Sequence, residues 1–151
     1  MDSPGSHRLR QGRVSIQGQI YLLTTTEQHR QPIFRDFHLA RMLVGELRRA
    51  QETGLARSLA WVVMPDHLHW LLELQHTSLD ALMRRVKCRG AYLVNRSCRQ
   101  QGGLWQKGYH DRALRQEDNI RATARYIVAN PLRAGLVSTI RDYPHWDAAW
   151  L

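Results

Sequence analysis

The chain has 151 residues, 43% of them hydrophobic and 23% charged, which predicts one folded domain with a sizeable core. No apolar stretch approaches the roughly 20 residues of a membrane-spanning helix, so we expect no membrane association. Because the N-terminus also lacks the apolar segment of a signal peptide, we expect a cytoplasmic protein. The formal net charge of +9 favours a polyanionic partner such as nucleic acid, but an arginine-rich soluble protein without such a partner explains it equally well.

The first part of the chain is predicted to contain an arm, a strand and a helix. Residues 1–12 are polar and predict a flexible basic arm, followed by one domain over residues 13–151. Residues 20–25 are apolar or β-branched and predict a buried strand. Asp36 can cap a helix that runs to about Thr53. The core positions of this helix recur at helical spacing: Phe37, Ala40, Leu43, Leu47 and Ala50.

A β-hairpin and a second helix are predicted in the middle of the chain. Residues 58–64 and 67–74 predict two strands joined by a tight turn at residues 65–66. Ser78 can cap a helix that reaches about Arg99. The predicted core positions of that helix are Leu79, Leu82, Met83, Val86 and Leu93.

The last part of the domain is predicted to hold a short strand and a third helix. Residues 105–114 predict a loop and a short strand. The helix is predicted to begin near Glu117, where negative charge is favourable, and to end near Asn130, because the residue before Pro131 avoids helical conformation. Its apolar face is Ile120, Ala124, Ile127 and Val128. The order strand, helix, hairpin, helix, strand, helix predicts an α+β fold in which helices flank a central antiparallel sheet.

Two histidines on one predicted strand are candidate metal ligands. Side chains alternate between the faces of a strand, so His67 and His69 share one face and Leu68 takes the other. Imidazole nitrogens bind divalent transition metals. Histidines in strands are also often no more than buried, hydrogen-bonded residues, and this explanation stays open for the pair by itself.

Tyr126 and Asn130 form the second candidate pair, on the third helix. They are four residues apart and therefore neighbours on one helical surface, at the flank of the apolar face. Taken singly, each has an ordinary explanation, as a packed tyrosine and as a residue at a helix end. Brought beside His67 and His69, they would give a divalent-metal site next to a phenol, which is suited to cutting a phosphodiester by covalent attack.

Basic and aromatic residues gather in two further places. One is a stripe on the second helix, called here the basic stripe: Arg85, Arg89, Tyr92, Arg96 and Arg99. The other is the basic-aromatic run: Trp105, Lys107, Tyr109, His110, Arg112 and Arg115. Both sets suit single-stranded nucleic acid, where arginines bind the backbone and aromatic rings stack on bases. A solvated helix face is the competing explanation of the stripe, and Tyr109 is a rival to Tyr126 as nucleophile.

Four motifs span most of the chain: Gly12-Arg13-x-Ser15-x-x-Gly18-x-x-Tyr21, Trp61-Val62-Val63-Met64-Pro65-Asp66-His67-Leu68-His69, Leu104-Trp105-Gln106-Lys107-Gly108-Tyr109, and Tyr126-Ile127-x-x-Asn130-Pro131-x-x-Ala134-Gly135-Leu136-Val137. In composition and order they resemble the single-tyrosine HUH transposases, and among them the REP-associated tyrosine transposases of bacteria. The last motif is the most specific.

The resemblance implies a fold, an activity and a site. The implied fold is the HUH endonuclease fold, of ferredoxin-like type. The implied nucleophile is Tyr126, and the implied ligands of Mg²⁺ or Mn²⁺ are His67, His69 and Asn130. The implied partner is single-stranded DNA beside the hairpin of a repetitive extragenic palindrome (REP), which is cut and rejoined through a 5′-phosphotyrosine intermediate. The protein is then expected in the bacterial cytoplasm, associated with the nucleoid.

The predicted DNA contacts are Arg13 of the first motif, the basic stripe, and Trp105, Lys107, Arg112 and Arg115 of the basic-aromatic run. Two other functions stay open. One is a DNA-hairpin-binding protein with an idle active site, and the other is an unrelated metal hydrolase that uses His67 and His69 while Tyr126 is structural. We expect a monomer or a homodimer.

Overall fold

The structure, a computed structural model, describes residues 15–149, so the predicted arm and Arg13 lie outside the described residues. One five-stranded antiparallel sheet has the strand order β4-β1-β3-β2-β5. The strands are β1 (Ile20–Thr26), β2 (Ala56–Met64), β3 (His67–Leu74), β4 (His110–Leu114) and β5 (Trp146–Ala148). The predicted hairpin is β2–β3, in which Met64 pairs with His67 across the two-residue turn.

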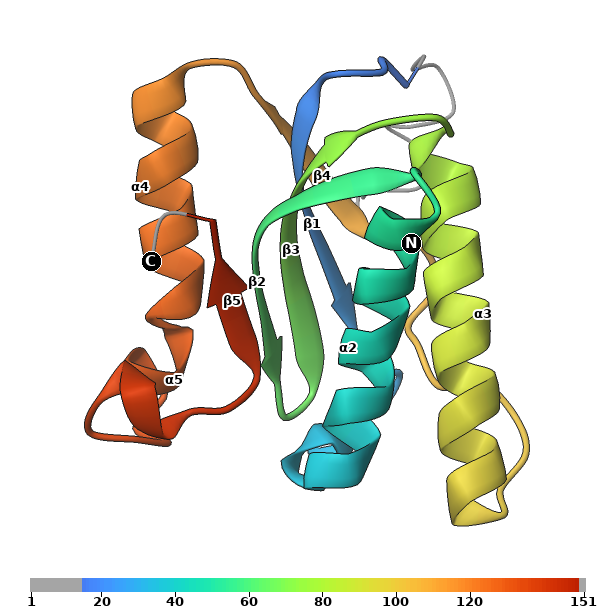
Figure 1. The fold of residues 1–151 in the computed structure, drawn as a ribbon. Helices are drawn as coiled ribbons and strands as arrows, with labels where there is room; N and C mark the ends of the chain where they lie inside the picture. The colour runs from blue at the N-terminus through green and yellow to red at the C-terminus, as the bar shows by residue number, and fades with distance from the viewer. Residues whose placement is uncertain (1–14, 150–151) are drawn as a thin grey trace.

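Helices cover both faces of this sheet (Figure 1). They are α2 (Phe37–Glu52), α3 (Leu79–Cys98), α4 (Glu117–Val128) and the short α5 (Asn130–Arg133), with 3-10 turns η1 (Ile33–Arg35) and η2 (Ile140–Asp142). The two predicted caps are present, since Asp36 accepts from the Leu39 N–H and Ser78 from the Ala81 N–H. Helices α2 and α3 lie on one side and α4 on the other, which confirms the predicted α+β fold with flanking helices.

Strand alternation divides the core into two layers. On β3, Leu68, Trp70 and Leu72 pack into the layer under α2 and α3. Leu71 of the same strand packs into the second layer, together with Ile127 of α4. We call the two sides of the sheet the α2/α3 face and the α4 face. His67 and His69 have the same parity as Leu71, so they belong to the α4 face.

Two predicted core positions are wrong. Phe37 is the first residue of α2 and is 61% exposed. Its ring contacts His145 of the C-terminal segment, with 5.1 Å between ring centroids, and does not enter the core. Leu93 is only partly buried, and Val94 takes the core position. Val94 continues the four-residue repeat of Val86 and Gly90, and Gly90 lets α3 pass close to α2.

The C-terminal region differs from its prediction in two respects. Helix α4 ends at Val128, but the chain turns directly into α5, because Pro131 fits the first turn of a helix. Strand β5 is absent from the prediction, since three residues carry too little periodicity. Tyr143 anchors this segment by donating a hydrogen bond of 2.5 Å to the Val63 carbonyl, and burial raises the pKa of its phenol to about 12.

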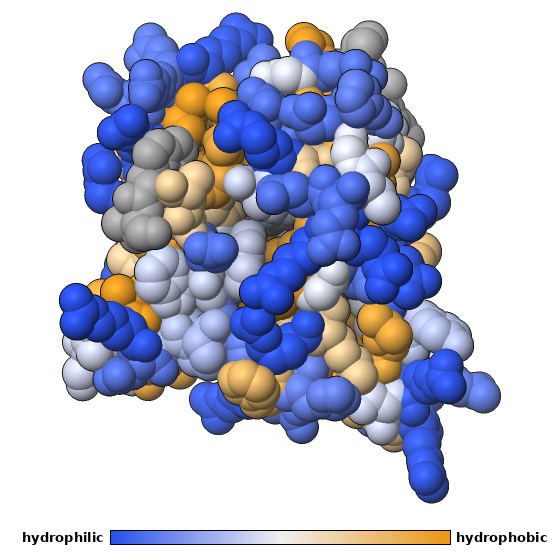
Figure 2. Space-filling view, viewed as in Figure 1, coloured by the Kyte–Doolittle hydropathy of each residue, from blue (hydrophilic) through white to orange (hydrophobic). Residues whose placement is uncertain are grey.

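The face of the molecule seen in Figure 2 is mostly polar. Figure 2 shows hydrophilic side chains over much of the face that α2, α3 and α4 present to the viewer, with hydrophobic side chains exposed in separate small patches. In the described part of the chain, no helix combines the length and the hydrophobicity needed to cross a membrane.

Candidate active site

The two candidate histidines are held in place through their Nδ1 atoms. His67 Nδ1 lies 2.6 Å from Asp66 Oδ1, and His69 Nδ1 lies 2.9 Å from Thr24 Oγ1 of the neighbouring strand β1. The rings meet edge to face, with 4.8 Å between centroids. Because an ionised carboxylate only accepts, the Nδ1 of His67 is the donor in this contact, which leaves Nε2 as the ring nitrogen that can face a ligand. This is the usual way in which a partner group orients a metal-binding imidazole.

The protonation states of His69 and Asp66 suit ligand chemistry. Burial lowers the pKa of His69 to about 4, and the nearby charges of His67 and Arg133 add to the effect. Burial tends to raise the pKa of Asp66, but the hydrogen bonds from His67 and Arg30 outweigh it and lower that pKa below its usual value. His69 is therefore neutral and Asp66 ionised at neutral pH, so one imidazole offers a lone pair and the other has a fixed acceptor behind it.

The tyrosine and the amide lie at the C-terminal end of α4 and the start of α5. Tyr126 is 64% exposed, so its phenol is accessible to a large molecule. Asn130 is half-buried, and its Nδ2 is buried without a hydrogen-bond partner among the residues that the structure describes. Its Oδ1 accepts a hydrogen bond from Arg133. The guanidinium of Arg133 also lies over the Tyr126 ring, 3.7 Å from the centroid.

The histidine pair and the helix end lie at the same end of the molecule. The β2–β3 turn, from which His67 follows, and α5, which begins with Asn130, both lie at the bottom of Figure 1. Arg133 links them, because its side chain bonds to Asn130 while its charge adds to the effects of burial and His67 on the pKa of His69. The fold thus gathers Tyr126, His67, His69 and Asn130 on the α4 face.

The donor set fits a divalent metal. It offers two imidazole nitrogens and one amide oxygen, a mixture that transition metals and Mg²⁺ or Mn²⁺ accept with positions left for substrate and water. No group of three or more His, Cys, Asp or Glu side chains placed to hold a metal occurs within residues 15–149. The amide of Asn130 is a candidate for the third protein ligand at this place.

Tyr109 lies on the other side of the sheet. It is buried in the layer under α2 and α3, and its phenol donates a 2.6 Å hydrogen bond to Asp80 Oδ1. Its side chain is thus separated from His67 and His69 by the sheet itself. The geometry leaves Tyr126 as the phenol beside the histidine pair.

The basic stripe also lies away from the histidines, because α3 covers the opposite face. Arg89 is half-exposed but paired, since its Nε lies 2.9 Å from Oε1 of Glu46 on α2, a carboxylate that is 4% exposed. The other members, Arg85, Tyr92, Arg96 and Arg99, are exposed, and Arg96 donates to the Tyr92 hydroxyl at 3.3 Å. The fold therefore leaves most of the stripe at the surface but does not bring it to Tyr126.

The residues of the basic-aromatic run do not share one surface. Trp105 is not an open stacking platform, because its ring stacks on Phe34 with 5.7 Å between centroids and its Nε1 donates to the Lys87 carbonyl. Lys107 and Arg115 are exposed. Arg112 extends over the α4 face and donates to Thr123 of α4 at 3.3 Å, so it lies on the same side of the sheet as the histidines.

Three residues of this site are missing from the predicted set. Asp66 and Thr24 orient the histidines, and Arg133 contacts both Tyr126 and Asn130. Arg133 could have been found from helical spacing, since it is three residues after Asn130 and seven after Tyr126. Thr24 could not, because the sequence does not give the register of β1 on β3.

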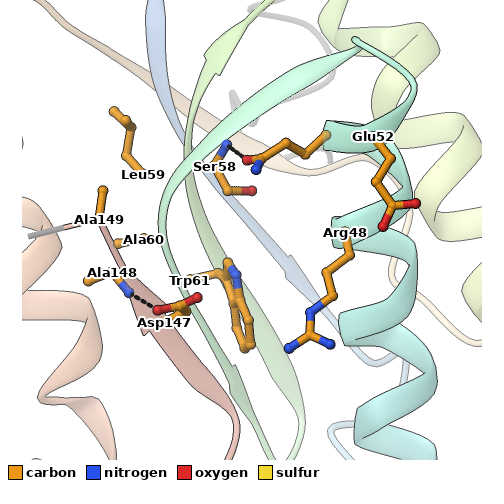
Figure 3. A pocket seen from close by; sticks show the side chains of 10 residues that line it. Arg48, Glu52, Ser58, Leu59, Ala60, Trp61, Asp147, Ala148 and Ala149 are labelled. Atoms are coloured by element: carbon orange, nitrogen blue, oxygen red, sulfur yellow. Dashed lines mark hydrogen bonds between the residues drawn. The ribbon is translucent and has the colours of Figure 1, made fainter. Parts of the chain in front are cut away.

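A cavity elsewhere has no part in this arrangement. It has a volume of about 380 Å³ and lies between α2, β2 and β5, where Arg48, Glu52, Trp61 and Asp147 line it (Figure 3). None of the predicted site residues lines it. We therefore place the candidate active site at the open surface around Tyr126, which suits a polymer substrate better than a small molecule.

Comparison with known proteins places the chain in a family. Residues 15–130, most of the chain, match the family described as "Transposase IS200 like". The chain belongs to the IS200-like transposase family. This confirms the resemblance noted in the sequence, and it supports DNA cleavage and transfer as the general activity. The matched region of this transposase runs from Ser15 to Asn130, so it contains Tyr126 and both histidines.

Named relatives agree with this assignment. The transposase is 24% identical to the REP-associated tyrosine transposase of Escherichia coli K12 over 145 residues, which cover 91% of this chain and 83% of the relative. It is also 24% identical over 99 residues to a Haemophilus influenzae protein named as a REP-associated tyrosine transposase. That match covers 58% of this chain and only 56% of the relative's length.

A solved structure shows the same fold. A REP-associated tyrosine transposase bound to a REP hairpin superposes with a TM-score of 0.74 at 23% sequence identity, covering 89% of this chain and 79% of that one. At this identity the likeness concerns the fold. It supports the predicted HUH-type architecture of the transposase, with a sheet and flanking helices in the same arrangement.

Proposed function

We propose that this transposase is a single-stranded DNA endonuclease and strand transferase that uses Mg²⁺ or Mn²⁺ and cuts beside hairpins like those of repetitive extragenic palindromes. The observation that carries the proposal is the arrangement at one end of the α4 face, where an exposed phenol lies near two oriented imidazoles and an amide oxygen. The hairpin as substrate rests on the REP hairpin bound by the structural relative and on the names of the two sequence relatives.

The protein residues have distinct tasks in this reaction. His67, His69 and Asn130 hold the metal, with Asp66 and Thr24 fixing the imidazoles from behind. A bound Mg²⁺ or Mn²⁺ ion supplies polarisation of the scissile phosphate at such a site. The Tyr126 oxygen then forms a bond to phosphorus as the bond to the 3′ oxygen breaks. The phenol loses its proton to solvent, and the leaving 3′ oxygen takes one up, so a 5′-phosphotyrosine and a free 3′-OH result.

The covalent product explains how strands are joined without a nucleotide cofactor. The phosphotyrosine retains the phosphodiester bond energy, so attack by another 3′-OH reverses the first step and releases Tyr126. Exposure of Tyr126 lets both the incoming and the outgoing strand reach it. Backbone contacts would come from Arg112 on the α4 face and from exposed basic residues such as Lys107 and Arg115.

The test is formation of the covalent adduct. The protein is incubated with labelled REP-type hairpins that carry single-stranded flanks, with Mn²⁺ or with EDTA, and the products are run on a denaturing gel. We expect a protein–DNA adduct with the metal, its loss in EDTA and in Tyr126→Phe, and its retention in Tyr109→Phe. An adduct that survives in Tyr126→Phe would move the nucleophile elsewhere. Hairpin binding by the wild type without cleavage in any metal would favour the idle DNA-binding alternative.

A further inference from the structure

Arg133 makes three contacts with the two helical residues of the candidate site. Its guanidinium lies over the Tyr126 ring at 3.7 Å from the centroid, and it donates a 2.6 Å hydrogen bond to the Tyr126 carbonyl. It also donates to Oδ1 of Asn130. These contacts follow from helical spacing, because residues 126, 130 and 133 lie along one surface of consecutive helical turns. The contact set is therefore built into the α4–α5 segment.

The atom that Arg133 binds is the same atom that the metal needs. Oδ1 is the only ligand atom that Asn130 can offer to a cation, because its Nδ2 is a donor. A guanidinium stays charged at every ordinary pH, so a divalent ion on Oδ1 would lie next to a permanent positive charge. The same charge reaches His69, where it adds to the lowering of the pKa that burial and then His67 cause. In the DNA-free protein, the positive charge of Arg133 thus disfavours binding of a divalent metal ion at two of the three proposed ligands, Asn130 and His69.

Arg133 also lies where a phosphate of an arriving DNA strand would contact the protein. Its side chain is exposed, and it covers the ring of the proposed nucleophile. A phosphodiester positioned for attack by Tyr126 must approach this guanidinium. Arginine binds phosphate oxygens through two parallel N–H donors, which is a stronger contact than its hydrogen bond to a neutral amide. A phosphate can therefore draw Arg133 away from Asn130.

We propose that Arg133 exchanges between Asn130 Oδ1 in the DNA-free protein and the scissile phosphate in the complex, so that metal binding is coupled to DNA binding. This rests on the proposed function, since it assigns Asn130 to the metal. The exchange predicts that loss of Arg133 changes metal affinity and the rate of cleavage in opposite directions. Removal of Arg133 strengthens metal binding without DNA, because the competing cation is gone, and weakens catalysis, because the phosphate loses a bidentate contact.

Metal binding is measured first, without DNA and without reference to activity. The probe is Mn²⁺, titrated into the protein and followed by the electron paramagnetic resonance signal of the free ion. Arg133→Met keeps an unbranched apolar chain over the Tyr126 ring, and Arg133→Gln keeps a polar one. We expect both variants to bind Mn²⁺ at least about tenfold more tightly than the wild type. The matched control is Arg125→Gln, an exposed arginine of α4 that should leave Mn²⁺ affinity unchanged.

Cleavage is measured second, in single-turnover reactions with the same variants and enough Mn²⁺ to saturate each of them. We expect Arg133→Met to slow cleavage by about tenfold to a hundredfold, while Arg125→Gln cleaves at the wild-type rate. A residue with only a structural role would weaken metal binding and cleavage together. Tighter metal binding combined with slower cleavage is the signature of the exchange.

The outcomes separate this inference from the proposed function. If His69→Ala removes the Mn²⁺ site but Arg133→Met and Arg133→Gln bind Mn²⁺ no better than the wild type, the exchange is wrong and the metal site stands. If both arginine variants cleave at the wild-type rate, the phosphate contact is wrong. If His67→Ala and His69→Ala leave Mn²⁺ binding unchanged, the proposed metal site is wrong and the exchange fails with it.

Discussion

Thr24 Oγ1 and His69 Nδ1 lie 2.9 Å apart, in a hydrogen bond that joins β1 to β3 across the centre of the sheet. The two residues are paired in the register of these strands, so their side chains emerge side by side on the α4 face. The next residue, Thr25, is buried on the other face, and its hydroxyl has no partner among the described residues. Of these two adjacent threonines, Thr24 thus contacts a candidate metal ligand, whereas Thr25 is buried on the opposite face of the sheet.

We predict that Thr24→Val weakens metal binding and cleavage by about tenfold, because the isosteric side chain no longer fixes the orientation of the His69 ring. Unfolding should change little, since valine suits a strand. Mn²⁺ affinity and single-turnover cleavage measure the effect. The matched control is Thr25→Val, which removes a buried unpaired hydroxyl and should leave cleavage unchanged and stability equal or higher. Equal effects of the two substitutions on cleavage would contradict the orienting role.

We predict a graded loss across the proposed metal ligands. His67→Ala and His69→Ala should each abolish cleavage in Mg²⁺ and Mn²⁺, because each removes one of the three proposed protein ligands. Asn130→Ala should cost less, about tenfold to a hundredfold, because water can replace a neutral amide oxygen. Circular dichroism checks folding, and cleavage that persists in EDTA or in the double histidine variant would show that the metal assignment is wrong.

We predict that Arg89→Ala lowers the free energy of unfolding by about 2 kcal/mol, because it leaves the buried carboxylate of Glu46 with only the longer Arg49 contact of 3.7 Å. Arg85→Ala, on the same helix but exposed, should stay within about 0.5 kcal/mol of the wild type. Urea unfolding measures both. Equal stability of the two variants would mean that the ion pair between Arg89 and the buried Glu46 carboxylate contributes nothing.

DNA binding by the basic stripe should be tested at its exposed arginines, with Arg89 left unchanged because it pairs with Glu46. If Arg85 and Arg96 bind DNA phosphates, Arg85→Ala/Arg96→Ala should flatten the salt dependence of hairpin binding by about 0.7 for each phosphate that the variant no longer neutralises. Affinity is measured across a salt series for hairpins with single-stranded flanks. An unchanged slope would identify the stripe as a solvated face and direct attention to Lys107, Arg112 and Arg115.

We predict that stability falls as the pH drops from about 6.5 towards 4. His69 has a pKa of about 4 in the folded state against an ordinary value of 6.5, so the unfolded state binds its proton first and acid favours unfolding. The loss should reach about 3 kcal/mol below pH 4. Urea unfolding of His69→Gln should show a flatter pH dependence over this window, whereas His38→Gln, at an exposed position, should follow the wild type.

Much of this protein could be predicted from the sequence because the signals are local. Alternation placed His67 and His69 on one face of a strand, and helical spacing placed Tyr126 beside Asn130. The caps Asp36 and Ser78 set the starts of the two long helices. Each of these features depends on dihedral preferences and hydrogen bonds within a few residues of one another. The resemblance of the motifs then gave the family, which the comparisons confirm.

The tertiary structure decided what depends on the pairing of distant segments. The sequence shows a basic stripe on the second helix, but only the packing of α3 against α2 engages Arg89 with Glu46 and puts the stripe across the sheet from the histidines. In the sequence, Tyr126 and Tyr109 are both tyrosines near basic residues. The structure distinguishes them, because they lie on opposite faces of the sheet. Strand register and the choice of sheet face arise from cooperative burial over the whole domain, so no local pattern of residues contains them.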